Sequence, residues 1–295
     1  MILISQKDID RVKWDSLVAQ NQGYVFSYSW YLDACAEDWC VLVDDFYLNG
    51  IALPLTSKLG ILAITPPIFV RNLNFIGKNA DFPKEALKYL QKQFQVGHIQ
   101  TTQIIEETNY KKRVFQTIDN EIKLGSQAKR MIQKAKKNEL EIRETQDWKA
   151  ILEIIRAELS EKISEFTPNN LEKLANLMQN MENTNRLYCL GIYKENSLQG
   201  GMVFMDTFEK TIYLKGAATA FARDNGGMYW CMQQAIERTL NEAKPFDFGG
   251  SEVDGVRRFN QNLGGIDQHY YIYTWNFAPA WFKFAKRMYQ LWKKK

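Results

Sequence analysis

The stretch from Thr211 to Gly265 constrains the fold of this 295-residue chain more than any other. Apolar residues alternate from Thr211 to Lys215, which predicts a strand. A turn that ends in two glycines follows, and then a helix from Met228 to Glu242 whose apolar residues form one buried stripe. Pro245 ends the helix, and residues 246–248 start another buried strand. Strand, glycine turn, helix and strand together predict a crossover unit.

The turn between this first strand and the helix is a candidate anion site. The first N–H groups of a helix have no partner within it and lie at the positive end of its dipole, so they favour a phosphate. Glycines permit a tight turn and the close approach of a ligand, and an arginine adds a bidentate donor. The alternative is a helix-entry loop whose glycines serve only the turn geometry. Residues 223–227 are the candidate pyrophosphate-binding turn, and the candidate donor-binding residues here are Lys215, Arg223, Asn225, Gly226 and Gly227.

Residues 247–251 follow at the carboxyl end of the second strand of this crossover unit. Open α/β sheets usually bind ligands at that end. Asp247 is a candidate to orient or deprotonate an attacking amine, and Ser251 is a candidate to relay the proton. The alternative is that Asp247 caps nearby backbone while Gly249 and Gly250 form a turn. We expect Gly250 and Ser251 to lie nearest to the ligand.

These motifs resemble those of a known family. The order of strand, glycine turn, helix and strand is similar to the acyl-donor half of the GNAT N-acyltransferase fold. Residues 247–251, followed by Gly255–Gly265, are similar to the FemABX peptidyltransferases and their acetyltransferase-like relatives. Ser126–Leu140 resembles the start of the second GNAT-like domain of those proteins. The chain departs from the family at its turn, which has fewer glycines, and at Asn260, where many relatives have lysine.

The resemblance implies an activity and a donor channel. The implied reaction moves an acyl or aminoacyl group to an amine, with acyl-CoA or aminoacyl-tRNA as the donor. The segment after residue 255 is implied to line the donor channel. Adjacent arginines on a short helix cannot both be buried, so at least one faces solvent or an anionic ligand. The alternative is a solvated helix packed by its phenylalanine. The residues concerned are Arg257, Arg258, Phe259 and Asn260.

The order of elements predicts an α/β (α+β) protein of two tandem GNAT-like domains, residues 1–122 and 123–295, with mixed sheets flanked by helices. No donor turn is visible in the first half, so it is expected to be a degenerate copy of the second. Residues 106–125 are expected to be the boundary and the least structured segment. Ile9, Val12 and Leu17 are expected to face inward, and Ser27 or Ser29 to cap the second helix. The expected helices are 7–20, 30–37, 84–95, 126–137, 148–159, 168–181 and 280–292, and the other expected strands are 39–43, 50–56, 61–64, 97–105, 140–143, 187–193, 201–208 and 269–275.

Composition narrows the class of protein. No apolar run approaches the roughly 18 residues needed to cross a bilayer, and the charged residues near the start do not fit a signal peptide. Four cysteines and two histidines are scattered without metal-ligand spacing, so we expect reduced thiols, no metal and a cytoplasmic protein. No serine or cysteine stands with histidine as a nucleophile. Direct attack by the acceptor amine is therefore the expected mechanism.

The predicted helix at 126–137 has a basic face without an acidic residue. Such a face can bind the phosphates of tRNA or of a nucleotide-linked acceptor, although a charge run is more often a solvated face. Its cations are Lys129, Arg130, Lys134, Lys136 and Lys137. In the first half, an aromatic and polar cluster is a candidate acceptor pocket, or else core or interface; it contains Tyr28, Trp30, Tyr31, Arg71 and Asn72.

The expected function is N-acyl transfer to a small-molecule or peptide amine. Acyl-CoA is favoured over aminoacyl-tRNA because the net charge of +4 is low for a tRNA binder and Asn260 replaces a family lysine. The alternatives are a non-catalytic protein that binds a nucleotide-linked or cell-wall precursor, and a nucleic-acid-binding module that uses the basic helix. The last predicted helix, after Pro279, carries an aromatic stripe beside lysines. It either docks on the first domain, which we favour, or lies on an anionic membrane.

Overall fold

The computed structural model describes residues 1–21, 24–106, 108–160, 162–164, 166–250, 253–282, 284 and 288. Ser251 and most of the predicted last helix lie outside these described residues. Contacts within the chain divide it into two compact units. The first unit contains Met1–Lys112 and Tyr270–Lys295, and the second contains Arg113–His269. Each unit buries its own hydrophobic core.

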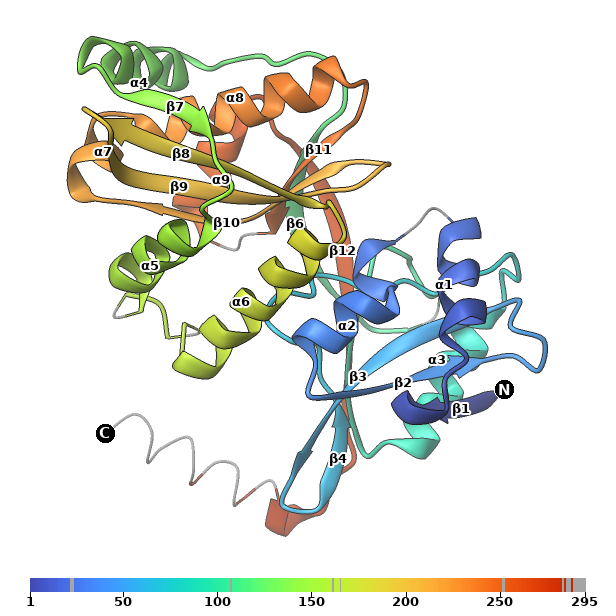
Figure 1. Cartoon of the computed structure of the whole chain (residues 1–295). Coiled ribbons are helices and arrows are strands. Elements are labelled where there is room, and N and C mark those ends of the chain that lie inside the picture. Colours follow the sequence, from blue (N-terminus) through green and yellow to red (C-terminus); the bar gives the residue numbers. More distant parts are fainter. Residues whose placement is uncertain are drawn as a thin grey trace. The chain divides into compact units, whose positions relative to one another are not determined.

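In the first unit, four antiparallel strands are followed by a helical crossover to a fifth strand (Figure 1). This fifth strand, β5, is parallel to β4 and antiparallel to β12. The apolar stripe that the sequence predicts on the crossover helix is confirmed, because Ala86, Leu87, Leu90 and Phe94 all enter the core. The elements are β1 (Ile2–Ser5), η1 (Gln6–Asp8), α1 (Arg11–Gln20), η2 (Val25–Ser27), α2 (Ser29–Cys35), β2 (Asp38–Val43), β3 (Gly50–Lys58), β4 (Ile61–Ile64), α3 (Phe82–Gln93), β5 (Val96–Thr101) and, from residue 270 onward, β12 (Ile266–Asn276).

The second unit also begins its sheet with four antiparallel strands, β7 to β10, before a crossover to β11. The crossover that the sequence predicts is confirmed, because β10 and β11 are parallel and joined through α8. The elements are, from residue 113 onward, β6 (Lys111–Ile118), and then α4 (Ser126–Lys137), β7 (Glu141–Glu144), α5 (Trp148–Leu159), α6 (Pro168–Asn183), β8 (Leu187–Lys194), β9 (Ser197–Asp206), β10 (Thr211–Ala218), α7 (Ala220–Asp224), α8 (Gly227–Asn241), β11 (Phe246–Gly250) and α9 (Asp254–Asn262).

The two units have the same topology. In each, two helices separate the first strand from three further antiparallel strands, and a helical crossover then leads to a parallel strand. In each, a sixth strand lies antiparallel to the fifth. In the first unit this sixth strand is β12, which follows β11 in sequence and pairs with β5. In the second unit it is β6, which follows β5 in sequence and pairs with β11. The repeated fold expected from the order of elements is confirmed.

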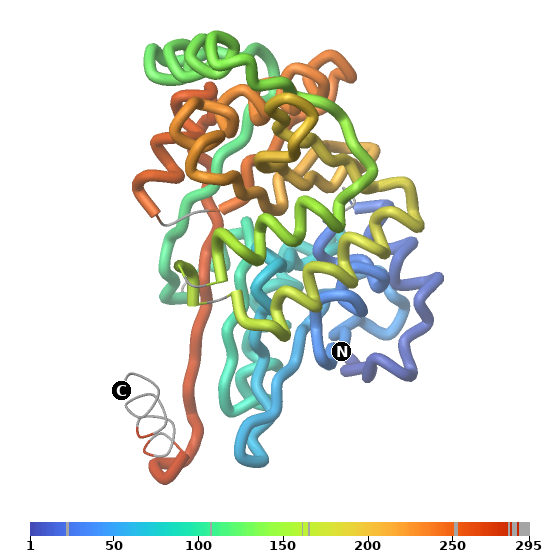
Figure 2. Tube along the Cα trace, turned by 60° about the vertical axis from the view of Figure 1, so that its left-hand side comes forward, coloured from blue at the N-terminus to red at the C-terminus, as the bar shows by residue number. Residues whose placement is uncertain are grey.

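Helices cover both faces of the sheet in the second unit. Figures 1 and 2 show α4 beside α8 on one face, and α5 and α6 on the other. The core under α4 and α8 includes Met202 and Phe204 of β9 together with Cys231 and Met232 of α8. On the other face, a side chain at Gly201 would come within 2.7 Å of Ile151 in α5. A glycine at this position therefore allows α5 to approach the strand closely.

The segment expected to be least structured contains a strand, so that expectation is wrong. β6 lies within residues 106–125 and pairs with β11, with one register shift between Asp247 and Gly250. Its apolar pattern does not alternate, because Gln116 is buried between Phe115 and Ile118. The Gln116 amide is satisfied by side chains distant in sequence, and no pattern within the segment itself indicates this.

The inward positions predicted around α1 are confirmed in part. Ile9, just before the helix, and Leu17 are buried, but Val12 is 78% exposed. Trp14 is fully buried instead and donates from its indole nitrogen to the Ser27 carbonyl at 2.7 Å. The expected serine cap on the next helix is also wrong. Asp15 of α1 accepts hydrogen bonds from the backbone nitrogen and the hydroxyl of Ser29 at 2.8 and 2.7 Å. A carboxylate from the neighbouring helix therefore caps α2.

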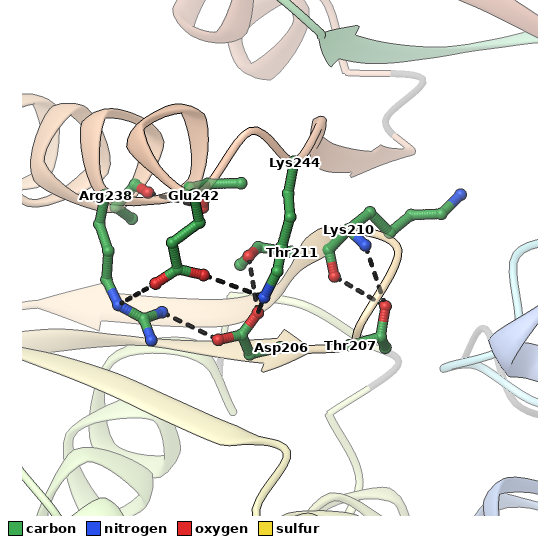
Figure 3. A network of polar contacts seen from close by, with 9 residues as sticks. Asp206, Thr207, Lys210, Thr211, Arg238, Glu242 and Lys244 are labelled. Atoms are coloured by element: carbon green, nitrogen blue, oxygen red, sulfur yellow. Dashed lines mark hydrogen bonds and ion pairs between the residues drawn. The ribbon is translucent and has the colours of Figure 1, made fainter.

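The ends of β9 and α8 are joined by a cluster of charged side chains (Figure 3). Asp206 accepts from Arg238 at 3.0 Å, from Lys244 at 3.2 Å and from the Thr211 hydroxyl at 3.1 Å. Glu242 lies 2.9 Å from Lys244 and 3.3 Å from Arg238. Because Lys244 stands between α8 and β11, this cluster fixes the crossover at the end where β10 and β11 begin.

We expect Asp206→Asn to lower the free energy of unfolding by about 1.5–3 kcal/mol, because it weakens charged hydrogen bonds to two cations that are mostly buried. Urea unfolding followed by circular dichroism measures this change. Glu209→Gln in the same hairpin makes the same change of charge at an exposed site, and should cost less than about 0.5 kcal/mol. Equal effects of the two substitutions would show that the cluster does not stabilise the crossover.

Candidate donor site

The parallel strands β10 and β11 are paired over only two residue pairs, Thr211 with Phe246 and Ile212 with Asp247. Beyond these pairs, β10 continues beside β9 as far as Ala218, and β11 continues beside β6 as far as Gly250. The two strands therefore separate toward their carboxyl ends. An open α/β sheet usually binds its ligand at that end.

Two irregularities of the backbone accompany this separation. The register of β10 shifts between Tyr213 and Lys215, so the residue between them is an extra one, as in a β-bulge. In β11, Gly249 has a φ of 75°, and a side chain there would lie 3.2 Å from the Tyr213 carbonyl oxygen. The buried Asp247 carboxylate accepts a hydrogen bond from the Gly249 N–H at 2.9 Å. This is the backbone-capping contact expected if Asp247 has a structural role, and Gly250 beyond it is exposed.

Lys215 lies just after the bulge and contacts an aromatic ring. Its ammonium nitrogen is 4.5 Å from the centre of the Phe166 ring. This is the geometry of a cation–π contact. Phe166 itself is buried in the connection that leads into α6. The contact places the Lys215 side chain beside that connection.

The glycine turn packs tightly on α4. α7 occupies part of the predicted turn, and α8 begins at Gly227. Gly226 has a φ of 84°, and a side chain there would lie 2.1 Å from the Met131 carbonyl oxygen. Both glycines are buried, whereas Asn225 is half-buried and donates to the Phe221 carbonyl at 3.0 Å. The glycines are therefore required by packing, whatever else they do.

Arg223 is the exposed cation of this turn, with half of its side chain in solvent. Its guanidinium lies 3.4 Å from Glu158 of α5 and 3.4 Å from Asp224. The hydrogen bond from Lys162, together with Arg223, holds the pKa of the Glu158 carboxyl below its usual range. A phosphate that binds Arg223 must therefore compete with an ionised carboxylate.

The basic face of α4 lies at the same turn. Lys134 donates to the Asp224 carbonyl at 2.9 Å, and the Lys136 ammonium lies 5.5 Å from the centre of the Trp230 ring in α8. All five cations predicted on this helix, including Lys129, Arg130 and Lys137, are exposed. Within the described part of the chain, none of them forms an ion pair with a carboxylate. The sequence suggests that the glycine turn and the basic face of α4 are separate surfaces, but in the structure they lie side by side.

The residues predicted on α9 have partners within the second unit. Arg257 pairs with Asp267, and this hydrogen bond holds the pKa of the Asp267 carboxyl below its usual range. Arg258 is exposed, as expected for one of two adjacent arginines. Phe259 packs 4.5 Å from the ring of Tyr229 in α8, and the buried Asn260 amide donates to Gln116 at 2.9 Å. Asn260 therefore joins α9 to β6.

The residues predicted for the acceptor lie in the first unit. The Arg71 guanidinium is 5.5 Å from the centre of the Phe26 ring, and its Nε donates to Asn72 at 3.1 Å. Trp30 packs edge-on against the buried Tyr31, and the Tyr28 carbonyl accepts from the Tyr31 N–H at 3.1 Å. These contacts are typical of packing, and an acceptor role for the five residues remains a proposal.

In the first unit the corresponding separation of strands is filled by the chain itself. β4 and β5 are also paired over only two residue pairs. Beyond them, the Leu73 N–H donates to the Gln100 carbonyl at 2.7 Å, and Asn74 accepts from Thr101 and Thr102. The cavity beside Leu73 and Gln100 has a volume of about 10 Å³, which is the space of a single water molecule. A larger cavity of about 240 Å³ lies at the start of α3, between residues 75–83 and Gln103. The space directly between β4 and β5 is therefore filled by the chain itself.

Three of the four cysteines are poor nucleophiles. Burial raises the pKa of the Cys40 and Cys189 thiols to about 12 and raises that of Cys231 further, so these thiols stay protonated. His98 contacts Gln100 at 2.9 Å and His269 is exposed. Among the described residues there is no group of three or more histidines, cysteines and acids that could hold a metal. No helix in the described part is long and apolar enough to cross a membrane.

We expect Gly226→Ala to lower the free energy of unfolding by about 2–4 kcal/mol, because it combines an unfavourable φ with a clash against the Met131 backbone. Gly255→Ala is the control, since a side chain there meets nothing within 4 Å. In the first turn of α9, that change is expected to be neutral or stabilising by up to about 1 kcal/mol. Thermal unfolding of both variants measures the difference. A Gly226→Ala variant as stable as the wild type would disprove the packing argument.

No family model and no curated protein matches this chain, but several solved structures are similar in fold. FemX is 11% identical with a TM-score of 0.59, and the match covers 99% of each chain. The C-terminal domain of a putative lysylphosphatidylglycerol synthetase from Agrobacterium fabrum is 12% identical with a TM-score of 0.59, over 90% of this chain and 92% of that one. A tandem GNAT protein from the clavulanic acid biosynthesis pathway is 10% identical with a TM-score of 0.55, over 95% and 99% of the two chains. Together with the repeated topology, these similarities show that the chain has the FemABX/GNAT-like fold, with two tandem GNAT-like domains.

Proposed function

We propose that this protein is an N-acyltransferase whose second unit binds the acyl donor between the separating ends of β10 and β11. The observation that carries the proposal is that three features meet at one place. The strands stop pairing after two residue pairs, α8 starts at the same end of the sheet, and the unpaired cations of α4 lie beside that start. A donor with an acyl group at one end and phosphates at the other matches this arrangement.

The proposed chemistry is a direct transfer. The lone pair of the acceptor amine attacks the acyl carbonyl carbon, a C–N bond forms, and the bond from carbon to the sulfur or oxygen of the donor breaks. The leaving thiolate or alkoxide is protonated, and the amine loses a proton to a base. Backbone N–H groups at the β10 bulge are candidates to stabilise the developing oxyanion. Asp247 is the candidate base, with Ser251 as the candidate relay.

The donor is proposed to be acyl-CoA, with aminoacyl-tRNA as the alternative. Three cations lie on or beside the turn, namely Arg223, Lys134 and Arg130, and a CoA ester carries only a pyrophosphate and one further phosphate. The net charge of +4 is small for the many phosphates of tRNA. Because Lys134 of α4 lies at the turn, the cations of this helix can also serve the phosphates of a small donor. The acceptor is proposed to be the amine of a small molecule or peptide.

A second candidate is a protein that binds a nucleotide-linked or cell-wall precursor without catalysis. The observation that favours it is the hydrogen bond from the Gly249 N–H to the buried Asp247 carboxylate, because a residue used to shape the turn is less available as a base. The fold neighbours favour an enzyme, since their names include FemX, a putative synthetase and a GNAT protein. Turnover of an acyl-CoA with a panel of amines distinguishes the two candidates.

We expect Arg223→Ala to weaken donor binding by about 1.5–3 kcal/mol, which is the contribution of a charged hydrogen bond to phosphate. Stability should change by less than about 1 kcal/mol, because the pair with Glu158 is exposed. Arg156→Ala is a matched control, since Arg156 also forms an exposed pair with a glutamate, Glu153, on α5. Calorimetric titration with acetyl-CoA and free CoA gives the affinities. Equal affinity of the wild type and the Arg223 variant would remove this residue from the donor site.

Charge reversal on α4 separates the two donors. We expect the triple variant Lys129→Glu, Arg130→Glu and Lys134→Glu to bind acyl-CoA about 10-fold more weakly, or worse. We also expect that the wild type does not show tRNA binding of the kind that weakens steeply with salt. The control reverses Lys88, Lys92 and Lys111, which are exposed cations of the first unit. If the wild type binds tRNA with an affinity that falls steeply with salt, and only the α4 variant loses it, aminoacyl-tRNA is the donor. If neither ligand raises the melting temperature, the proposed function itself fails.

A further inference from the structure

The first unit exposes six large apolar side chains from two segments of the chain. Each is between 43% and 67% exposed. Two come from the hairpin between β3 and β4, and four come from the segment after β12. We call this set the C-terminal patch; its members are Leu59, Leu62, Phe277, Trp281, Phe284 and Met288. Monomeric proteins rarely expose large contiguous apolar patches unless the surface binds something.

A small core holds the two segments together. Ile61 of the hairpin packs with Ala278 and the buried Phe282, and the partly buried Val96 of β5 joins them. Figure 1 shows the hairpin tip beside the start of the last helix. Trp281, Phe284 and Met288 follow at spacings of three and four residues, which places them along one side of a helix. The chain therefore docks on the first unit through Phe282 while this other side remains exposed.

The hairpin turn carries an apolar residue where folding favours a polar one or a glycine. Leu59 and Gly60 both have positive φ, at 52° and 76°. Two-residue turns of this kind favour asparagine, aspartate and glycine, and a bulky residue at positive φ is uncommon. The chain has a second such turn, between β8 and β9, formed by Glu195 and Asn196. Leu59 is exposed and contributes little to the core, and residues held at unfavourable φ cluster at functional sites.

The charged residues that adjoin the C-terminal patch in the sequence are all basic. No aspartate or glutamate occurs after Asp267, and the sequence beyond Phe282 contains six cations, Lys283, Lys286, Arg287, Lys293, Lys294 and Lys295. Lys58 precedes Leu59 in the hairpin. Exposed tryptophan and phenylalanine next to lysine and arginine is the composition of a segment that lies in a membrane interface. Anionic lipid headgroups attract such cations over about a Debye length.

We propose that the C-terminal patch binds the surface of an anionic lipid bilayer, with its apolar side chains in the interface and the flanking cations among the headgroups. The segment lies on the membrane and does not cross it. This surface belongs to the first unit, whereas the proposed donor site belongs to the second. Membrane binding and donor binding are therefore separable by experiment.

The test uses the full chain and sedimentation with vesicles of phosphatidylcholine alone or with about 30 mol % phosphatidylglycerol, which gives the vesicle surface a negative charge. We expect binding to the anionic vesicles at low salt, weaker binding at high salt, and a blue shift of tryptophan fluorescence. Trp281→Ser, Phe284→Ser and Met288→Ser together should lower the partition coefficient about 10-fold or more. The control triple variant, Val12→Ser, Phe46→Ser and Leu48→Ser, removes three exposed apolar residues elsewhere in the first unit and should bind as the wild type does.

Leu59→Asn gives a second, independent readout. It should weaken vesicle binding, while its melting temperature stays the same or rises, because asparagine tolerates positive φ better. A lower melting temperature would show that Leu59 has a structural role, which contradicts the proposal. Failure of the wild type to bind anionic vesicles overturns it, and so does equal binding by the patch triple variant. If the wild type instead forms a dimer that the triple variant loses, the patch is a protein interface and the lipid proposal is wrong.

Discussion

The short parallel pairing of β10 and β11 is the constraint on which the rest of the second unit depends. Two residue pairs hold the strands together at one end, and the hydrogen bond from the Thr211 N–H to the Pro245 carbonyl, at 3.2 Å, closes that end. The charged cluster around Asp206 then fixes the position of α8 relative to both strands. At the other end, the bulge in β10 and the positive φ of Gly249 direct the two strands apart. The Thr211–Pro245 hydrogen bond and the Asp206 cluster hold the paired end of the two strands together. The other end can therefore separate without the strands coming apart.

The same constraint has the opposite outcome in the first unit. There too, only two residue pairs join the parallel strands, so backbone groups of β5 beyond them need other partners. The long connection between β4 and α3 supplies them, through Leu73 and Asn74. In the second unit the corresponding connection is taken up by α7 and the glycine turn, which pack on α4. The lengths and destinations of these two connections explain why one copy of the fold keeps a candidate site and the other fills it.

Much of this architecture is visible in the sequence because it depends on local patterns. α4 and α5 have the expected bounds, Ser126–Lys137 and Trp148–Leu159, because each carries a regular apolar stripe. The crossover is visible because glycine, proline and the apolar stripe of α8 occur within one short stretch. The site is less visible because its contacts are distant in sequence. Gln116 and Asn260 are 144 residues apart, and the Met131 carbonyl that requires glycine at position 226 belongs to a helix with no sequence signal for that contact.

The segment that contains β6 therefore contributes to the site, although the sequence predicts it to be a domain boundary. β6 covers the edge of β11 that β10 does not use, and Gln116 of β6 holds α9 through Asn260. The chain then turns at Gly125, whose N–H donates to the Asn262 carbonyl at 2.7 Å, before it enters α4. α4 in turn presents its backbone to Gly226 and its cations to the start of α8. Because β6 positions α9, α9 positions the start of α4, and α4 packs on Gly226, the shape of the glycine turn depends on β6. A donor that binds at this turn would be sensitive to the pairing of β6 with β11, even though no residue of β6 lies on the turn.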